Sequence, residues 1–452
     1  MGSRLAERIS DIRKLAQDHR HVIVLALIGV VERLIFWLVY APIPYPDTAS
    51  YMRIAGVLSN FNLEGFDGTR VIGYPLFLAL LGRDPKLVWL AQMGLGLAIS
   101  ILIFLIILRA TQRKDLALLG GLTYDLLAGQ VFFEANLLTE TLTSFLIVVS
   151  LALFTKLFVT KNHTSKLLLA MLLGVSSSLA GLVRPLFFFL PLWFFPFVYL
   201  STPGRLRNRL ASLIVFSIAP LLLLGGWLAY MRTAFHVLSP TAMGGYYLVQ
   251  HTGVFFELLP DDNALIRDSY LEVRDMHIAE KGNQTNAIWD AIPILEQATG
   301  LGFYDLSREL QKISLQLIKE NPGYYLKNVI GGWIGFWKAP VFWSPTSIAS
   351  ELMRPIASFW VGMSRGLAIA ANFLFLIISS IYVLSSKARK RLDFDYPMIA
   401  VFGLIWTTSI IQTLVDHGDN ARFLIPLQMT MVYFLLRAIF SWRQSNRIKE
   451  IA

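Results

Sequence analysis

About ten long apolar segments constrain the fold of this chain more than any other feature. A helix needs about 20 apolar residues to cross the roughly 30 Å hydrocarbon core of a bilayer, where only helices and closed barrels satisfy their backbone groups. Segments of this kind lie at 22–40, 87–108, 116–133, 138–158, 166–183, 185–200, 210–230, 356–384, 397–415 and 423–440. Hydrophobic residues make up 55% of the 452 residues and charged residues 15%, outside the range of soluble domains. The sequence therefore predicts an all-α polytopic membrane protein with about ten to twelve transmembrane helices.

The distribution of basic residues predicts how these helices are oriented. The net charge of +10 would favour nucleic-acid binding in a soluble protein, but here the basic residues occupy alternate loops. They cluster at 4–20, 109–114, 156–166, 205–209, 387–391 and 443–449. Cytoplasmic loops carry such an excess of Lys and Arg. We therefore expect both termini in the cytoplasm, the first apolar segment retained as a signal anchor, and no nucleic-acid partner. The expected location is the cytoplasmic membrane of a bacterium.

The hydrophilic segments between the apolar ones divide the chain into three parts. A module of about seven spans at 1–230 includes the first outer loop, 41–86, whose short apolar stretches predict helices along the membrane interface. A large extracytoplasmic loop occupies 231–355, and a C-terminal transmembrane module occupies 356–452. Within the large loop, 324–343 is interpreted as interfacial or re-entrant, because a crossing there would reverse the charge parity that follows. Its Trp residues suit a headgroup-level belt.

The sequence offers little support for a metal or a nucleotide. It contains no cysteine, and His251 and Glu257, like Asp261 and Asp262, share a loop without the helical spacing of a two-histidine site. We interpret that loop as solvated and assign no metal-ligating residues, so no cofactor is established and a divalent metal is possible but not supported by the sequence. The glycine pair Gly94–Gly96 lies inside an apolar segment without a preceding strand, which indicates helix packing instead of phosphate binding.

Asp47 is the first candidate for chemistry. It lies in Pro44–Tyr51, directly after the first apolar segment, where the chain leaves the membrane. A carboxylate at this boundary is positioned to deprotonate an acceptor beside a lipid-linked donor. An aspartate after proline and before Thr48 is equally typical of a helix N-cap. The two interpretations are compatible, and spacing does not separate them.

Three arginines are candidates for binding the phosphate of such a donor. Arg70 precedes a short apolar stretch, Arg184 precedes Pro185 between two apolar segments, and Arg422 begins the last one. A guanidinium group binds phosphate oxygens through two parallel hydrogen bonds. Each arginine taken alone could also be an anchor whose charge reaches the headgroups.

Acidic residues within the apolar pattern form a further set of candidates. Glu140 lies inside the fourth apolar segment, where a carboxylate is costly and therefore a candidate functional residue, with an ion pair to a neighbouring helix as the alternative. Glu134 is interpreted as a solvated turn residue. Glu32 and Arg33 point about 100° apart on a helix, so we expect them, and Asp125, to pair with other helices in structural roles.

Several of these motifs together resemble the GT-C superfamily of polyprenyl-phosphate-sugar-dependent membrane glycosyltransferases, in the branch of protein O-mannosyltransferases and aminoarabinose transferases. The resemblance covers most of the chain and also includes the order of spans, large outer loop and further spans. The motifs are Pro46-Asp47 with Tyr51, Arg70-Val71-Ile72-Gly73-Tyr74-Pro75-Leu76, Leu138-Thr139-Glu140-Thr141-Leu142, Arg184-Pro185, and Asp419-Asn420-Ala421-Arg422-Phe423 with Pro426.

The resemblance implies a GT-C-like helical bundle and a role for each motif residue. Asp47 would be the catalytic base and Glu140 the second acidic residue, while Arg70 and Arg422 would contact the donor phosphate. One departure is that Thr48 and Ala49 follow Asp47, where many members carry a second acidic residue. The resemblance therefore does not extend to a metal site beside Asp47.

These observations predict an inverting glycosyltransferase. It would move one sugar from a polyprenyl phosphate to a glycolipid, polysaccharide or protein at the outer membrane face, with Arg184 as a third phosphate ligand. The candidate contacts to the sugar or acceptor are Tyr51, Tyr74, Glu134, Tyr246 and Tyr247, and interfacial anchoring is the alternative for the aromatic ones. The competing hypotheses are a transporter or flippase of a lipid-linked sugar, which performs no chemistry, and a membrane scaffold.

Overall fold

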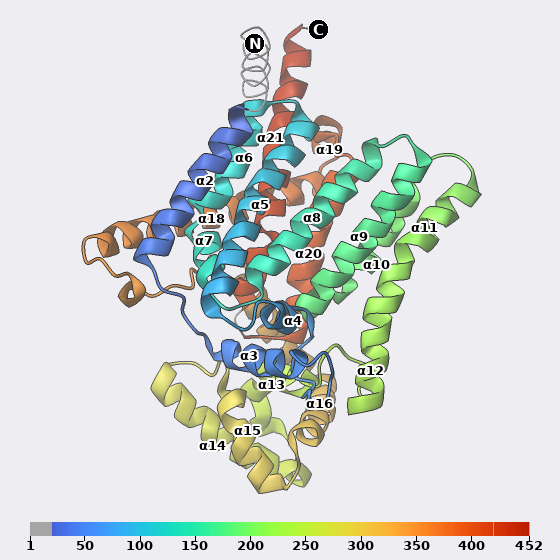
Figure 1. Cartoon of the computed structure of the whole chain (residues 1–452). Helices are drawn as coiled ribbons and strands as arrows, with labels where there is room; N and C mark the ends of the chain where they lie inside the picture. Colours follow the sequence, from blue (N-terminus) through green and yellow to red (C-terminus); the bar gives the residue numbers. More distant parts are fainter. Residues whose placement is uncertain (1–19, 419, 452) are drawn as a thin grey trace.

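The chain forms a bundle of membrane-length helices with a smaller group of helices at one end (Figure 1). The computed structural model describes residues 20–418 and 420–451. The basic positions at 4–14 and Asp419, which belong to the charge pattern and to one motif, lie outside the described residues. Within them, every named element is a helix, and the one isolated β-bridge joins Tyr40 to Ile348.

Eight helices are long and apolar enough to cross a membrane, which confirms the prediction of an all-α polytopic protein. They are α2 (Arg20–Val39), α5 (Pro85–Thr111), α8 (Glu140–Val159), α9 (His163–Val183), the continuous α11 (Leu206–Pro220), η2 (Leu221–Gly225) and α12 (Gly226–Phe235), then α18 (Met353–Leu384), α20 (Tyr396–Val415), and η6 (Asn420–Leu427) with α21 (Gln428–Ile451). The pair α6 (Lys114–Leu126) and α7 (Ala128–Ala135) is bent by 53° and makes a ninth if it is one span. The expected segment at 185–200 forms η1 (Pro185–Phe189) and the short apolar α10 (Leu190–Ser201).

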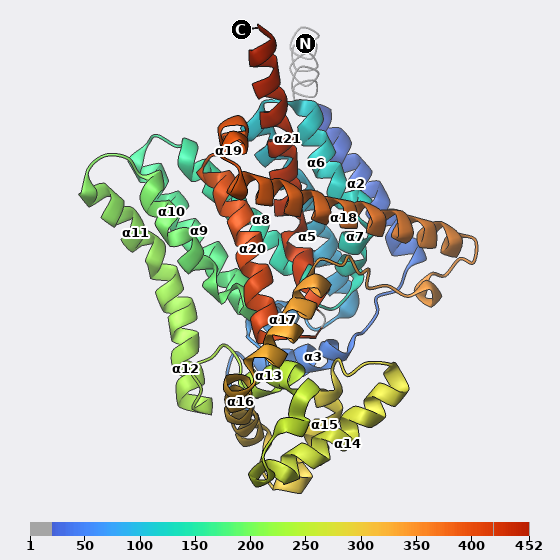
Figure 2. The same ribbon diagram turned by 180° about the vertical axis from the view of Figure 1, so that it is seen from behind.

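The two ends of the bundle differ in what they carry (Figures 1 and 2). The start of α2, the end of α21 and the basic helix α19 (Ser386–Leu392) lie at one end. The short helices of segments 41–86 and 231–355 lie at the opposite end, so the described ends of the chain and segment 41–86 are separated by the length of the bundle. This arrangement agrees with the parity of the basic loops.

Two short helices in the first outer loop cap the bundle at the outer end. They are α3 (Pro46–Leu58) and α4 (Gly73–Leu80), and α3 lies across the ends of the long helices (Figure 1). The fixed backbone of Pro46 suits the first turn of a helix, and the Thr48 hydroxyl accepts a 2.9 Å hydrogen bond from the Tyr45 N–H. Thr48 also donates to the Leu137 carbonyl at 3.2 Å, which fastens α3 to the α7–α8 connection.

The hydrophilic segment folds into a helical group with its own core. Its helices are α13 (Gly244–Thr252), η3 (Gly253–Leu258), η4 (Asp261–Asn263), α14 (Ala264–Lys281), α15 (Ala287–Thr299) and α16 (Phe303–Glu320). Tyr246, Tyr270, Leu306 and Leu310 are among the residues buried between them. Burial of these side chains gives the segment a defined structure beside the outer end of the bundle (Figure 2).

The segment interpreted as interfacial or re-entrant forms α17 (Pro322–Phe336), which is too short to count as a span, followed by η5 (Pro345–Ser347). Trp337 is buried and stacks on Phe375 of α18, while Trp333 is half-buried, stacks on Trp406 of α20 and donates to the Ser409 hydroxyl at 3.1 Å. Contact with neighbouring helices therefore fixes both rings, and their place in a headgroup-level belt stays a prediction.

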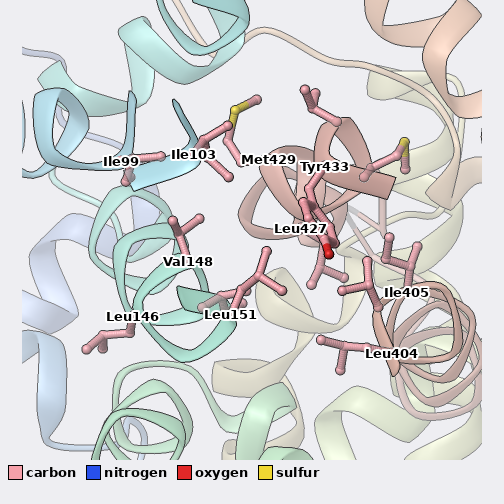
Figure 3. Close-up of a cluster of buried hydrophobic side chains, with 14 of the residues drawn as sticks. Ile99, Ile103, Leu146, Val148, Leu151, Leu404, Ile405, Leu427, Met429 and Tyr433 are labelled. Atoms are coloured by element: carbon pink, nitrogen blue, oxygen red, sulfur yellow. The ribbon is translucent and has the colours of Figure 1, made fainter. Parts of the chain in front are cut away.

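A common apolar core joins the first and last parts of the chain (Figure 3). Ile99 and Ile103 from α5 and Val148 and Leu151 from α8 lie beside side chains of α20, η6 and α21. The labelled C-terminal members are Leu404, Ile405, Leu427, Met429 and Tyr433. This packing brings η6, directly before α21, beside α8. Arg422 in η6 and Glu140 at the start of α8 therefore lie close together.

A buried ion-pair cluster lies between α2 and its neighbours. Arg33 donates to Asp125 at 3.1 Å and to Glu134 at 2.6 Å, and all three side chains are buried. The expected pairing of Arg33 and Asp125 with other helices is confirmed. The interpretation of Glu134 as a solvated turn residue is wrong, because α7 continues the bent pair into the protein and directs this carboxylate toward Arg33.

Gly73 allows α4 to contact α9 closely, and its substitution should destabilise the protein. A Cβ atom at this position would lie 2.7 Å from the Leu182 carbonyl carbon and 2.8 Å from the Val183 nitrogen. Because backbone atoms of α9 cannot move aside like a flexible side chain, we expect Gly73→Ala to cost about 1–3 kcal/mol. Thermal unfolding in detergent measures this, and Gly94→Ala is the matched control, since a Cβ at Gly94 meets nothing within 4 Å. Equal melting temperatures for the two variants would contradict the expected contact.

Candidate active site

Asp47 lies in the first turn of α3 with each carboxylate oxygen bound to a different arginine. Oδ1 accepts from Arg70 Nη2 at 2.8 Å and Oδ2 accepts from Arg422 Nη1 at 2.8 Å. The side chain is 28% exposed. Its oxygens therefore bind guanidinium groups from two distant segments of the chain, while Tyr45 occupies the N-cap position of α3.

Glu140 begins α8 and is fully buried. Its Oε1 accepts from Arg184 Nη1 at 2.9 Å and also from Arg422 Nε. The ion-pair interpretation of Glu140 is confirmed, since the residue binds Arg184 and Arg422, and its functional role stays a prediction. Arg422 links the two carboxylates because its Nη1 and Nε bind one each.

The five candidate residues form one continuous chain of ion pairs, in the order Arg70, Asp47, Arg422, Glu140 and Arg184. Three guanidinium groups face two carboxylates, so the cluster carries one surplus positive charge. Charged groups this far from bulk water interact strongly with one another. This row of ion pairs is thus electrostatically suited to bind an anion.

Aromatic rings and a hydroxyl hold the arginines in position. The Arg184 guanidinium carbon is 4.1 Å from the centroid of the Phe423 ring, and that of Arg70 is 5.0 Å from the centroid of the Tyr51 ring. Arg70 Nε also donates to the Ser50 hydroxyl at 3.0 Å. Sequence reasoning missed Ser50 as a member of the site, although its position three residues after Asp47 places it on the same side of α3.

The neighbouring charges decide the protonation state of Asp47. Burial by itself raises the pKa of this carboxyl, but the positive charges of Arg70 and Arg422 and their hydrogen bonds outweigh that effect and hold the pKa well below its usual range. Asp47 is therefore ionised at neutral pH. A carboxylate bound by two guanidinium groups is a weak base until at least one of them is drawn to another anion.

A cavity of about 410 Å³ opens beside these residues. Asp47, Arg70, Arg184 and Arg422 all line it. Its other walls are largely apolar, and they include Leu186, Phe188, Phe189, Ile411, Val415 and Phe423. A cavity with cationic groups at one place and aliphatic and aromatic walls elsewhere matches an amphipathic ligand with an anionic head.

The predicted sugar or acceptor contacts separate into two groups. Tyr51 and Tyr247 line the cavity. Tyr74 is buried behind Tyr51 and bonds to Gln92 at 3.2 Å, and Tyr246 lies in the core of the outer helices, where its hydroxyl donates to the Phe303 carbonyl at 2.6 Å. Glu134 belongs to the Arg33 cluster. The structure thus brings only two of the five to the cavity.

The described residues offer no group of three or more metal-ligating side chains. His251 and Glu257, which share a loop in the sequence, have separate surroundings. Glu257 binds Arg274 at 2.6 Å, and His251 is buried 5.3 Å from the ring of His417. Burial and the proximity of His417 lower the pKa of His251 to about 3, so it is neutral.

Comparisons with known proteins identify similar structures but no close relatives. No family model and no curated protein matches this chain. The archaeal oligosaccharyltransferase AglB from Archaeoglobus fulgidus, in complex with an inhibitory peptide and a dolichol-phosphate, has a TM-score of 0.48 and 13% identity over 96% of this chain and 52% of that one. ArnT from Cupriavidus metallidurans, bound to undecaprenyl phosphate, has a TM-score of 0.37 and 13% identity over 94% of this chain and 78% of that one.

This chain thus spans about half the length of the archaeal oligosaccharyltransferase. A second structure from Archaeoglobus fulgidus, an oligosaccharyltransferase tethered to an acceptor peptide, has a TM-score of 0.46 and 11% identity over 93% of this chain and 50% of that one. All three of these structures have TM-scores below 0.5 and identities of at most 13%.

Proposed function

We propose that this chain is an inverting glycosyltransferase that moves a single sugar from a polyprenyl phosphate to an acceptor hydroxyl at the extracytoplasmic face of the membrane. The observation that carries the proposal is the chain of three arginines and two carboxylates beside the cavity with apolar walls. A prenyl chain suits those walls, and a phosphate suits the arginines.

The proposed reaction is a single displacement at the anomeric carbon of the sugar. The acceptor oxygen forms a bond to that carbon as the bond from the carbon to the phosphate oxygen breaks. Asp47 takes the acceptor proton, and the polyprenyl phosphate leaves with the bonding electrons. One displacement inverts the anomeric configuration. General base catalysis of this kind contributes about 10²–10⁴-fold to a rate.

The arginines would have two roles in this reaction. They neutralise the negative charge that grows on the phosphate as the sugar leaves. Binding of the donor phosphate by Arg70 and Arg422 also competes with Asp47 for their N–H groups, which makes Asp47 a stronger base once the donor is present. Arg184, which is bound to Glu140 and packed on Phe423, would be the third phosphate ligand.

Binding of the lipid phosphate tests the donor site. Purified protein in nanodiscs should bind undecaprenyl phosphate in preference to undecaprenol, which has the same chain and no phosphate. Arg184→Gln should reduce this preference about tenfold or more, because it removes a hydrogen bond to a charged group. The control is Arg205→Gln, an exposed arginine near the start of α11, which should leave the preference unchanged. Equal binding of the two lipids would refute the phosphate site.

Transfer itself is measured with membranes that contain labelled polyprenyl-phosphate sugar and an extract of cell-envelope acceptors. Product that depends on the protein supports the enzyme. If reconstituted protein instead moves the lipid across the bilayer in the absence of acceptor and forms no product, the transporter hypothesis replaces this one.

A further inference from the structure

A second cavity, of about 610 Å³, shares Arg422 with the first. We propose that it binds the acceptor, and that the acceptor is an acidic saccharide, a hydrophilic molecule with hydroxyl groups and at least one carboxylate or phosphate. This inference rests on the proposed function and adds the class of acceptor to it. No residue other than Arg422 lines both cavities in the part of the chain that the structure describes.

The position of the second cavity suits an acceptor that enters from outside the membrane. One wall is the glycine-rich face of α17, with Gly331, Gly332 and Gly335, and another is the connection between α14 and α15. Figure 2 shows α17 between the outer helices and the bundle. Arg422 and Phe342 also line this cavity, so a molecule bound in it can reach the ion-pair chain without entering the apolar cavity.

The walls of the second cavity are more polar than those of the first. Its described lining includes no leucine, isoleucine or valine, while the first cavity has all three. Asparagine, threonine, histidine and lysine side chains supply hydrogen-bond donors, and the glycines of α17 leave the helix surface open. A lipid tail would find no leucine, isoleucine or valine to contact here. A hydroxyl-rich molecule does have partners, and the Phe342 ring suits a sugar face.

The charges along the second cavity favour an anion. Lys281, Lys338 and Arg422 line it, and no carboxylate does among its described lining residues, Asp419 being outside the described part of the chain. Lys281 is 3.3 Å from Asp290, which does not line the cavity. Lys338 is exposed and forms no ion pair within the described residues. An anionic group on the acceptor would therefore find Lys338 available.

The shared arginine places this acceptor beside the proposed base. Asp47 Oδ2 is 2.8 Å from Arg422 Nη1. If an acceptor hydroxyl binds Arg422 from the second cavity, only the Arg422 guanidinium group lies between that hydroxyl and Asp47. When Arg422 turns toward the donor phosphate, the hydroxyl can pass its proton to Asp47, while the acidic group of the saccharide stays at Lys338.

Binding of oligogalacturonate to the full-length protein in zwitterionic nanodiscs tests the inference, with a neutral maltooligosaccharide of the same length as the comparison. We expect the acidic saccharide to bind at least about tenfold more tightly, consistent with one charge-assisted contact. Gly335→Leu should weaken this binding by a similar factor, because its side chain would enter the cavity where a Cβ meets nothing within 4 Å. Gly362→Leu is the matched control, since it is an equally open glycine on the exposed side of α18 and lines neither cavity.

The charge at position 338 provides a second, independent variant. Lys338→Glu should weaken oligogalacturonate binding more than Lys338→Gln, and neither should change the affinity for undecaprenyl phosphate. Equal binding of acidic and neutral saccharides, no binding of either, or unchanged binding by both Gly335→Leu and Lys338→Glu would overturn the inference. Displacement of the saccharide by phosphatidylglycerol in the nanodisc would assign the cavity to a lipid headgroup and also overturn it.

The same variants separate this inference from the proposed function. If Asp47→Asn abolishes transfer while Gly335→Leu leaves the acceptor KM unchanged, the enzyme proposal stands and the acceptor site is wrong. If oligogalacturonate binds at Lys338 while no transfer from polyprenyl phosphate is found under any condition, the saccharide site stands and the proposed reaction is wrong.

Discussion

Asp47→Asn is expected to lower sugar transfer by about 10²–10⁴-fold, the usual contribution of a general base. Asparagine has nearly the same shape but cannot take the acceptor proton, and its amide group would face one of the two guanidinium groups that now bind the carboxylate. Binding of undecaprenyl phosphate should persist, since Arg70, Arg184 and Arg422 remain. The measurement is the initial rate of transfer from labelled donor, with protein amount matched between samples.

Asp115→Asn is the control for this substitution, because Asp115 is an exposed carboxylate paired with Arg113 at the start of α6. The pH profile adds a second readout. Because the pKa of Asp47 is held well below its usual range, the carboxylate stays ionised as the pH falls from about 7 to 5, and an acid loss of activity from this group belongs below that window. Near-normal transfer by Asp47→Asn would rule out its assignment as the base.

Arg422→Gln should abolish transfer and also destabilise the protein. It removes the cation between Asp47 and Glu140, and Glu140 is fully buried. Removing one partner of a buried ion pair costs about 3–5 kcal/mol, and the loss here should lie at the low end of that range because Glu140 keeps its ion pair with Arg184. Thermal unfolding in detergent measures the loss of stability, and the transfer assay measures the loss of function.

A double substitution separates these two effects. The stability of Glu140→Gln combined with Arg422→Gln should differ from the sum of the two single effects by about 0.5–3 kcal/mol, the usual coupling of contacting residues, and transfer should stay absent because the phosphate ligand is missing. Arg113→Gln is the control, as an exposed ion pair contributes only about 0–1 kcal/mol. An Arg422→Gln protein with wild-type stability and activity would contradict the bridging role.

The helical architecture was predictable because it depends on local composition. Long apolar segments can cross a bilayer only with their backbone bonded internally, and eight of the expected segments meet the criteria for spans. The short helices of the first outer loop could also be predicted, since its apolar stretches are too short to cross. Only the contacts of α17 with α18 and α20 showed that Trp333 and Trp337 stack on rings of those helices.

The members of the candidate site were predictable one by one, but their connection was not. Asp47, Glu140 and the three arginines could each be singled out, because a charged side chain at membrane depth is costly and is therefore a candidate functional residue. Sequence spacing does not reveal which carboxylate binds which guanidinium when 375 residues separate Asp47 from Arg422. The same limit explains Glu134, whose partner Arg33 lies 101 residues earlier in the chain.

The sequence by itself determined that this chain is a helical membrane protein with acidic and basic residues at the end of the bundle opposite the basic loops. Hydropathy and charge act locally, so they can be read from the order of residues. The tertiary structure alone decided that Arg422 binds Asp47 and Glu140 together and lies between two cavities. The physical reason is that such contacts depend on how α3, α8, α17 and α21 pack, and packing is a property of the whole bundle.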